Sequence, residues 1–320
     1  MRIKQLFTDV KNYPDFWQFR AINLLKILAQ SVCLWLGLMM SAQAQDADVA
    51  KRIITLGPDV TEIVYALGAN DKIVALDRSS KYPADTANKT NVGYRRSLSA
   101  EGVLALHPDL IIASEDIGPP EVVDVLNQSG VPVLYIPAQN SREGLIKKIN
   151  IIAERLKLEP QGEVLTSSVI KDFDAAMAYV QKVSAGQHKK VVFFHGLAKL
   201  SGAGSETAAD AFIRHAGGVN PLAVYKGYKE VSEEWLLEAE PDVVLMLSDG
   251  AGGPKAEDVF SLKALQTTPA AKTNALIVLD GPYMLGFGPR TAEAVRILAK
   301  ALYEQFSALR SVERRMAADF

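Results

Sequence analysis

Hydrophobic residues between positions 51 and 306 form short uninterrupted runs, separated by longer stretches in which apolar residues recur with helical spacing. The uninterrupted runs, which are typical of parallel strands covered on both faces, lie at 52–56, 72–76, 110–113, 132–136, 190–194, 243–247 and 275–279. The stretches that predict helices lie at 59–67, 119–129, 207–216 and 291–306. This alternation predicts an α/β fold of the doubly wound, Rossmann-like type.

The middle of the chain contains few residues that break helices. Residues 141–156 and 160–183 predict two consecutive helices, and Pro160 suits the first turn of the second one. The predicted division of the chain is an N-terminal α/β lobe at 45–158, a linking helix at 159–184 and a C-terminal α/β lobe at 185–306.

An internal repeat indicates that the two lobes are related. Residues 98–112 and 231–245 share serine, glutamate, proline and aspartate in register. Each copy predicts a capped helix, a Pro-Asp turn and a buried parallel strand. A Gly-Tyr pair precedes each copy, as Gly93-Tyr94 and as Gly227-Tyr228. We therefore expect Tyr94 and Tyr228 at equivalent places in the two lobes.

The first 44 residues resemble a secretory signal peptide rather than part of a fold. Arg20 and Lys26 precede an apolar run at 27–40, which is short for a membrane span. Ala42-Gln43-Ala44 then provides the small-x-small pattern that signal peptidase recognises. We expect export and cleavage after about Ala44, with an uncleaved anchor as the alternative. Cys33 is the single cysteine of the chain, so the mature protein would have no disulfide and no thiolate metal site.

The charge of the mature chain argues against nucleic acid as a partner. The whole chain has 35 basic and 37 acidic residues, and residues 1–44 contain five and two of these. The remainder has 30 basic and 35 acidic residues, a formal charge of −5. Non-specific binding to nucleic acid requires a concentrated basic surface instead. The polar tail at 307–320 is expected to be solvated.

One polar segment, residues 93–102, combines a phenol, two guanidiniums and a carboxylate immediately before a predicted helix and strand. A phenolate oxygen suits ferric iron, and tyrosine is a known axial ligand of haem iron. A neighbouring cation stabilises the ionised phenol. In an extended segment, residues two apart share a face. We therefore expect Arg96 beside Tyr94 and Arg95 pointing away.

The pattern Gly-Tyr-x-Arg-x-Leu-Ser-Ala-Glu-Gly at 93–102 resembles the ligand segment of periplasmic haem-binding proteins that feed ABC importers. A long helix between two α/β lobes is similar to the vitamin B12, siderophore and haem binders, and the resemblance covers residues 51–306. It implies a ligand cleft between the lobes and ferric haem b as the transported ligand. The implied partners are an ABC permease with its ATPase at the inner membrane, and a haem donor.

The resemblance also implies roles for residues of the first lobe. Tyr94 would be the axial ligand of the haem iron, and Arg96 would donate a hydrogen bond to its oxygen. Arg95 would contact either a haem propionate or solvent.

In the second lobe, Tyr228 would face the same cleft, with Lys226 and Lys229 beside it as partners of propionates or as solvated loop residues. His195 follows a strand, where ligands of open α/β sheets bind. It would approach the distal face of the iron or a second haem, or it would be an ordinary hydrogen-bonded histidine.

The segment 280–290 resembles the closing loop of the cleft in these proteins. Tyr283, Met284 and Phe287 would be apolar walls for a porphyrin, and packing in the core is the alternative for these side chains.

Glu101 and Glu234 match the pair of glutamates, one on each lobe, that dock against arginines of the permease. Their alternative role is helix capping, which we expect to suit Glu101 better than Glu234.

Two other functions are weighed against haem transport. The same fold could carry a corrinoid or a ferric siderophore, but Tyr94 together with Arg96 favours haem. A nucleotide-dependent enzyme would use the Gly-rich turn at 201–207, but Thr207 replaces the last glycine of a dinucleotide-binding loop. The N-terminus of the helix after that turn could instead receive a propionate. His107, His188 and His215 lack the spacing of metal ligands, and no catalytic pair is found, so we do not expect an enzyme.

Overall fold

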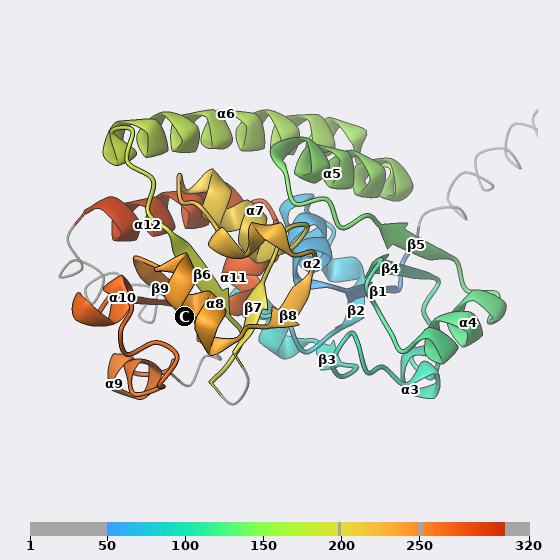
Figure 1. Cartoon of the computed structure of the whole chain (residues 1–320). Coiled ribbons are helices and arrows are strands. Elements are labelled where there is room, and N and C mark those ends of the chain that lie inside the picture. Colours follow the sequence, from blue (N-terminus) through green and yellow to red (C-terminus); the bar gives the residue numbers. More distant parts are fainter. Residues whose placement is uncertain (1–49, 198–199, 249–251, 305–320) are drawn as a thin grey trace, which may run out of the picture. The chain divides into compact units, whose positions relative to one another are not determined.

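The computed structural model describes residues 50–197, 200–248 and 252–304. Between residues 51 and 304 the chain forms two five-stranded sheets with helices around them, as Figure 1 shows. The predicted signal peptide at 1–44 and the predicted tail at 307–320 lie outside the described residues. No helix in the described ranges is long and apolar enough to cross a membrane.

The first sheet is parallel throughout, with the strand order β3-β2-β1-β4-β5. Its strands are β1 (Ile53–Leu56), β2 (Ile73–Leu76), β3 (Thr90–Asn91), β4 (Leu110–Ser114) and β5 (Val133–Ile136). Its helices are α2 (Pro58–Ala66), α3 (Ala100–Leu104) and α4 (Pro120–Gln128), with short 3₁₀ helices at Asn70–Lys72 and Ala84–Asn88. In a parallel sheet all strands end at one edge, and the loops that leave this edge are where ligands bind.

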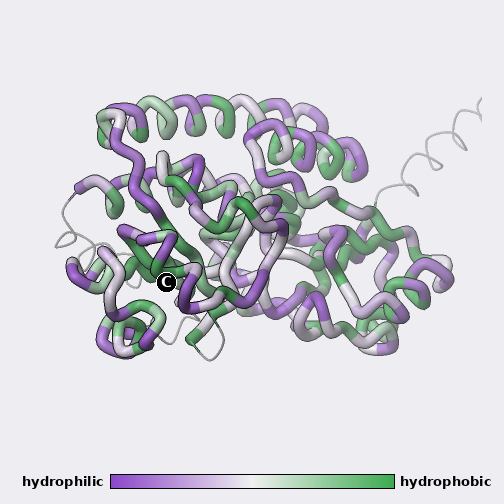
Figure 2. The backbone as a smooth tube through the Cα atoms, viewed as in Figure 1, coloured by the Kyte–Doolittle hydropathy of each residue, from purple (hydrophilic) through white to green (hydrophobic). Residues whose placement is uncertain are grey.

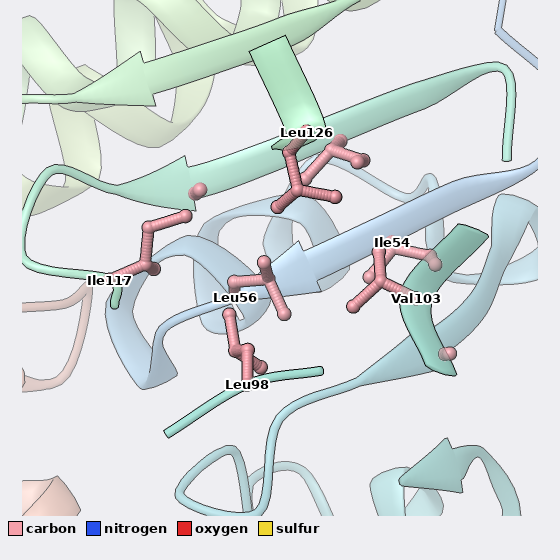
Figure 3. Packing of buried hydrophobic residues seen from close by; sticks show 9 residues of the cluster. Ile54, Leu56, Leu98, Val103, Ile117 and Leu126 are labelled. Atoms are coloured by element: carbon pink, nitrogen blue, oxygen red, sulfur yellow. The ribbon is translucent and has the colours of Figure 1, made fainter. Parts of the chain in front are cut away.

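Strands β1 and β4 form the centre of this lobe, and every residue of both strands is buried. Figure 3 shows Ile54 and Leu56 of β1 packed with Val103 of α3 and Leu126 of α4. Burial on both faces explains why these strands have continuous apolar sequences rather than an alternating pattern.

The second sheet has the order β10-β9-β6-β7-β8 and is mixed. Its strands are β6 (Val191–Phe194), β7 (Ser201–Ala203), β8 (Tyr228–Glu230), β9 (Val243–Ser248) and β10 (Leu276–Asp280). Strands β6, β9 and β10 are parallel to one another, whereas β7 pairs antiparallel with β6 on one side and with β8 on the other. The apolar runs predict the three parallel strands and omit β7 and β8, because these two are short and rich in polar residues or glycine.

The helices of the second lobe surround this sheet. They are α7 (Ala208–His215), α8 (Glu233–Ala239), α9 (Ala256–Phe260), α10 (Pro269–Lys272), α11 (Gly281–Leu285) and α12 (Thr291–Tyr303), with a 3₁₀ helix at Pro221–Val224. Figure 2 shows hydrophobic residues concentrated along the strands of both sheets.

Two consecutive helices, α5 (Arg142–Leu156) and α6 (Glu159–Ser184), connect the sheets. Helix α6 packs against α5 of the first lobe and against α12 of the second (Figure 1). Arg142 donates to Asp174 on α6 at 2.7 Å, and Tyr179 of α6 donates to Glu304 at 2.8 Å. The predicted long helix is therefore confirmed, while the exact limits of the lobes remain a prediction.

Candidate functional site

The ends of strands from both sheets bring the candidate residues near one another. Tyr94 follows β3 and Asp116 follows β4, while His195 follows β6 of the other sheet. Loss of solvent around the imidazole, together with the positive charge of Arg96, lowers the pKa of His195. The same guanidinium opposes the rise in the pKa of Tyr228 that burial causes. Arg96 of the first lobe thus acts electrostatically on two residues of the second.

Tyr94 lies in a turn, not in an extended segment. The N–H of Ser97 donates to the carbonyl of Tyr94 at 2.8 Å, and Gly93 before it has a φ of 95°. The expectation that Arg95 points away from Tyr94 is therefore wrong. The guanidinium carbon of Arg95 lies 5.9 Å from the centroid of the Tyr94 ring, and that of Arg78 lies 5.7 Å from it.

Asp116 holds both arginines of the predicted segment. Arg95 donates from Nε to Oδ1 at 3.0 Å and from Nη2 to Oδ2 at 2.9 Å. Arg96 donates from Nε and Nη2 to Oδ2 at 3.1 and 2.5 Å. Burial alone would raise the pKa of Asp116, but the hydrogen bonds from Arg95 and then from Arg96 bring it below its usual value. For Arg95, burial lowers the pKa, and Asp116 more than reverses this.

These contacts change two expectations. The Arg95 side chain is only 18% exposed and is paired with Asp116, so the solvated alternative is wrong. Arg96 pairs with Asp116 where a hydrogen bond to Tyr94 was expected, and its role toward an iron-bound Tyr94 remains a prediction. Asp116 itself is not recognisable in the sequence, except as a polar residue just after a buried apolar run.

Tyr228, His195 and Phe193 form an aromatic cluster on the second sheet. The Tyr228 and His195 ring centroids are 4.7 Å apart, and those of His195 and Phe193 are 5.2 Å apart. Tyr228 is 40% exposed, and His195 is also exposed. Both rings are therefore accessible at the edge of the sheet.

The lysines beside Tyr228 have protein partners. Lys226 pairs with Glu206 at 2.6 Å on the exposed surface, and the ammonium of Lys229 lies 5.4 Å from the Tyr225 ring centroid. Exposed pairs of this kind are weak, so they would give way to a stronger anion.

Met284 and Phe287 have no exposed surface. The core-packing alternative therefore describes both residues in this structure, and the expectation that they form walls of the cleft is wrong. Tyr283, in contrast, lines a cavity of about 820 Å³, although it is itself only 6% exposed. Its hydroxyl has no hydrogen-bond partner within 3.5 Å among the described residues, and desolvation raises its pKa.

The cavity is lined by loops of both lobes, and its lining includes an ion pair between the lobes. Its lining includes Pro58, Glu62, Lys81, Tyr82, Asp280, Pro282, Tyr283 and Arg290. Arg290 of the second lobe donates to both carboxylate oxygens of Glu62 at 2.9 to 3.1 Å. Its guanidinium carbon is 3.4 Å from the Tyr82 ring centroid and 4.8 Å from that of Tyr283. Burial raises the pKa of Glu62 despite the opposing effect of Arg290. The sequence analysis does not identify this pair.

Glu101 and Glu234 are exposed at the starts of α3 and α8. The serines two residues before them cap the helices, each accepting a backbone N–H at 3.2 Å. Hydrogen bonds from its own backbone and from Ser232 lower the pKa of Glu234. In both helices the cap is the serine, so which glutamate suits capping better stays a prediction.

The Gly-rich turn at 201–207 is occupied by structural contacts. A Cβ atom at Gly204 would lie 2.3 Å from the carbonyl oxygen of Tyr225, so glycine permits a close approach of two backbones. Thr207 caps α7, and its hydroxyl accepts the N–H of Asp210 at 3.1 Å and donates to Gly204 at 2.7 Å. These glycines thus serve the packing of β7. Among the described residues, no group of three or more His, Cys, Asp or Glu side chains could hold a metal ion.

Comparison with known proteins identifies relatives along most of the chain. The family described as "Periplasmic binding protein" matches residues 53–283. The structure of the periplasmic haem-binding protein RhuT from Roseiflexus sp. RS-1 in its apo form has a TM-score of 0.74 and 35% identity, covering 80% of this chain and 98% of RhuT. BhuT, a periplasmic haem-binding protein solved with two haems, has a TM-score of 0.74 and 33% identity, covering 79% of this chain and 98% of BhuT.

A third relative is named for a different ligand. The vitamin B12-binding protein of Vibrio parahaemolyticus is 26% identical over 272 residues, which cover 84% of this chain and 95% of that protein. The fold is thus shared by proteins named for haem and for vitamin B12, and the choice between them depends on the site.

Proposed function

The chain belongs to the periplasmic binding protein family, which matches it from residue 53 to 283, and from this premise we propose that it captures ferric haem and delivers it to an ABC importer. The observation that supports this most directly is the position of Tyr94, which lies within 6 Å of two guanidiniums at the end of the first sheet. Arg96, two residues later, is close enough for its charge to affect His195 and Tyr228 of the second sheet. The family is one of binding proteins, so it gives no support to the nucleotide-dependent enzyme.

Tyr94 would bind the ferric iron through its phenolate oxygen. Coordination requires loss of the phenolic proton, whose free pKa is about 10. The guanidiniums of Arg78 and Arg95 lie 5.7 and 5.9 Å from the centroid of the Tyr94 ring, where their positive charge would offset that of an iron-bound phenolate. Asp116 holds Arg95 in place by two hydrogen bonds, so this charge is already in position before the ligand arrives.

Residues of the second lobe would complete the site. His195 and Tyr228 are accessible, lie 4.7 Å apart and are close enough to Arg96 for its charge to affect both. Because the pKa of His195 is lowered, its imidazole is neutral near pH 7 and has a lone pair available for iron. Either ring can also stack against a porphyrin.

The alternative ligands are a corrinoid or a ferric siderophore. The Vibrio relative named for vitamin B12 supports a corrinoid. A phenol beside several guanidiniums favours an anionic ligand with ferric iron over a corrinoid with amide side chains, so haem remains the preferred ligand.

Delivery would take place at the inner membrane, after export of the chain to the periplasm. Glu101 and Glu234, one exposed on each lobe, would dock against cationic residues of a permease, whose ATPase supplies the energy. A haem donor is a further proposed partner.

An absorption titration of the mature protein with ferric haem tests this function. We expect saturable binding with a high-spin tyrosinate spectrum that Tyr94→Phe removes. Tyr179→Phe, which removes a hydroxyl from α6, is the matched control and should bind as the wild type does. An unchanged spectrum in Tyr94→Phe would move the ligand to His195 or Tyr228. A wild-type protein that binds no haem would refute the proposal and lead to titration with cobalamin and ferric siderophores.

A further inference from the structure

The edge of the first sheet carries an arginine that the sequence analysis does not identify. Arg78 lies in the loop after β2, its side chain is exposed, and its guanidinium is 5.7 Å from the centroid of the Tyr94 ring. No carboxylate forms an ion pair with Arg78 within the described part of the chain. A guanidinium without an acidic partner thus lies beside the proposed iron ligand.

The backbone around Arg78 is firmly held. The N–H of Arg78 donates to the carbonyl of Gly93, the residue before Tyr94, at 2.7 Å. Asp77, which has no exposed surface, anchors the loop. Asp77 accepts hydrogen bonds from the N–H groups of Gly57 and Ser79 and from the hydroxyls of Ser79 and Ser80. The backbone of Arg78 is therefore held next to the segment that carries Tyr94.

The nearby carboxylates are already engaged by other groups. Both oxygens of Asp77 accept hydrogen bonds from its own loop or from the end of β1. Both oxygens of Asp116 accept from Arg95 and Arg96. Of the two guanidiniums over the Tyr94 ring, Arg95 is paired with Asp116, so Arg78 is the one left to bind an external anion.

We propose that Arg78 binds a carboxylate of the ligand and so selects metalloporphyrins with free carboxylates. This inference rests on the proposed function and adds a specificity residue to it. A guanidinium binds a carboxylate through two parallel N–H donors, one to each anionic oxygen. Amides and esters carry no negative charge, so they bind a guanidinium more weakly. A ligand whose iron is bound by Tyr94 would place its periphery near this arginine, because both groups leave the same edge of the sheet.

The test compares two ligands and four proteins. Ferric haem and its dimethyl ester, in which both carboxylates are blocked, are titrated into wild type, Arg78→Gln, Arg78→Lys and Lys171→Gln. Lys171 is exposed on α6, so its change removes one positive charge away from the site. We expect Arg78→Gln to weaken haem binding about threefold to tenfold, as for a partly exposed charged pair, with no change for the diester. Arg78→Lys should recover part of the loss, and Lys171→Gln should match wild type for both ligands.

Each other outcome contradicts the inference in a distinguishable way. Equal affinities of wild type and Arg78→Gln for haem would show that Arg78 binds no carboxylate. If Arg78→Gln lost equal affinity for haem and for the diester, Arg78 would act on Tyr94 and not on a carboxylate of the ligand. If wild type binds neither ligand, the proposed function itself is wrong, and the inference is wrong with it.

Discussion

Asp116 accepts hydrogen bonds from Arg95 and Arg96, although its partial burial would by itself raise its pKa. We predict that Asp116→Asn lowers the free energy of unfolding by about 1 kcal/mol near pH 7. This is less than the usual value for charge-assisted hydrogen bonds, because the side chain is 33% exposed and solvent screens the pair. Urea unfolding of both proteins measures the difference.

The pH dependence of this loss follows from the lowered pKa. A carboxyl whose pKa is lower in the folded state stabilises the fold above its unfolded value of about 3.9 and ceases to do so as the pH falls through the folded value. The difference between wild type and Asp116→Asn should therefore shrink below about pH 4. Asp174→Asn, which breaks an exposed pair with Arg142, should cost clearly less than Asp116→Asn, because solvent screens the exposed pair. If Asp116→Asn lowered the free energy of unfolding equally near pH 7 and below about pH 4, the electrostatic explanation would be wrong.

At the residue scale, the sequence identifies groups that are contiguous and misses groups that folding brings together. Tyr94, Arg95 and Arg96 lie in one recognisable segment. Asp116 and Arg78 join them from the loops after β4 and β2. The order of the arginines around Tyr94 could not be predicted either, because a turn replaces the extended backbone that the side-chain alternation assumes.

At the element scale, prediction succeeds where burial is continuous. The runs that became β1, β4, β6 and β9 are apolar because both faces of the strands are covered. Strands β7 and β8 have no such run, and they are held by main-chain pairing with β6 and with each other. Their side chains, including Tyr228, therefore could not be assigned to a sheet from their sequence.

The repeated helices α3 and α8 carry the proposed docking glutamates. We predict that Glu101→Ala with Glu234→Ala leaves haem affinity unchanged, because both side chains are exposed and neither contacts Tyr94, Arg78 or His195 in the described structure. Uptake by the intact importer should fall strongly, whereas each single change should have a smaller effect. Two weak contacts act together because the second forms at a high effective concentration.

Transport assays in membranes or cells, paired with haem titrations, measure the two properties separately. Glu154→Ala, on an exposed position of α5, is a control for loss of a surface carboxylate. Normal uptake by the double variant would show that the glutamates do not dock the protein.

At the scale of the whole molecule, the internal repeat predicts two lobes, but no sequence pattern predicts which residues join them. Glu62 and Arg290 are far apart in the chain, and their pairing depends on how α2 and the loop before α12 approach each other. Burial of Glu62 raises its pKa even with Arg290 present. The desolvation of this carboxylate is thus only partly offset by its partner, as is common for buried ion pairs.

Because burial of the Glu62 carboxylate is only partly offset, removing Arg290 alone should cost more stability than removing both charges. Arg290→Gln leaves the Glu62 carboxylate buried without its partner and should lower the free energy of unfolding by about 2 to 3 kcal/mol near pH 7. A carboxyl with a raised folded pKa loses stability as the pH rises from its unfolded value, about 4.3, through the folded one. The loss should therefore be smaller near pH 4.5.

Adding Glu62→Gln to Arg290→Gln removes the stranded charge, so the double variant should be more stable than Arg290→Gln at pH 7. Part of the loss should remain, because the stacking of Arg290 on Tyr82 is gone. Urea unfolding of the single and double variants measures this coupling, and the exposed pair of Lys226 and Glu206 provides a matched cycle in which solvent screening should leave little coupling. A double variant less stable than Arg290→Gln would show that Glu62 stabilises the junction of the lobes through contacts other than its charge.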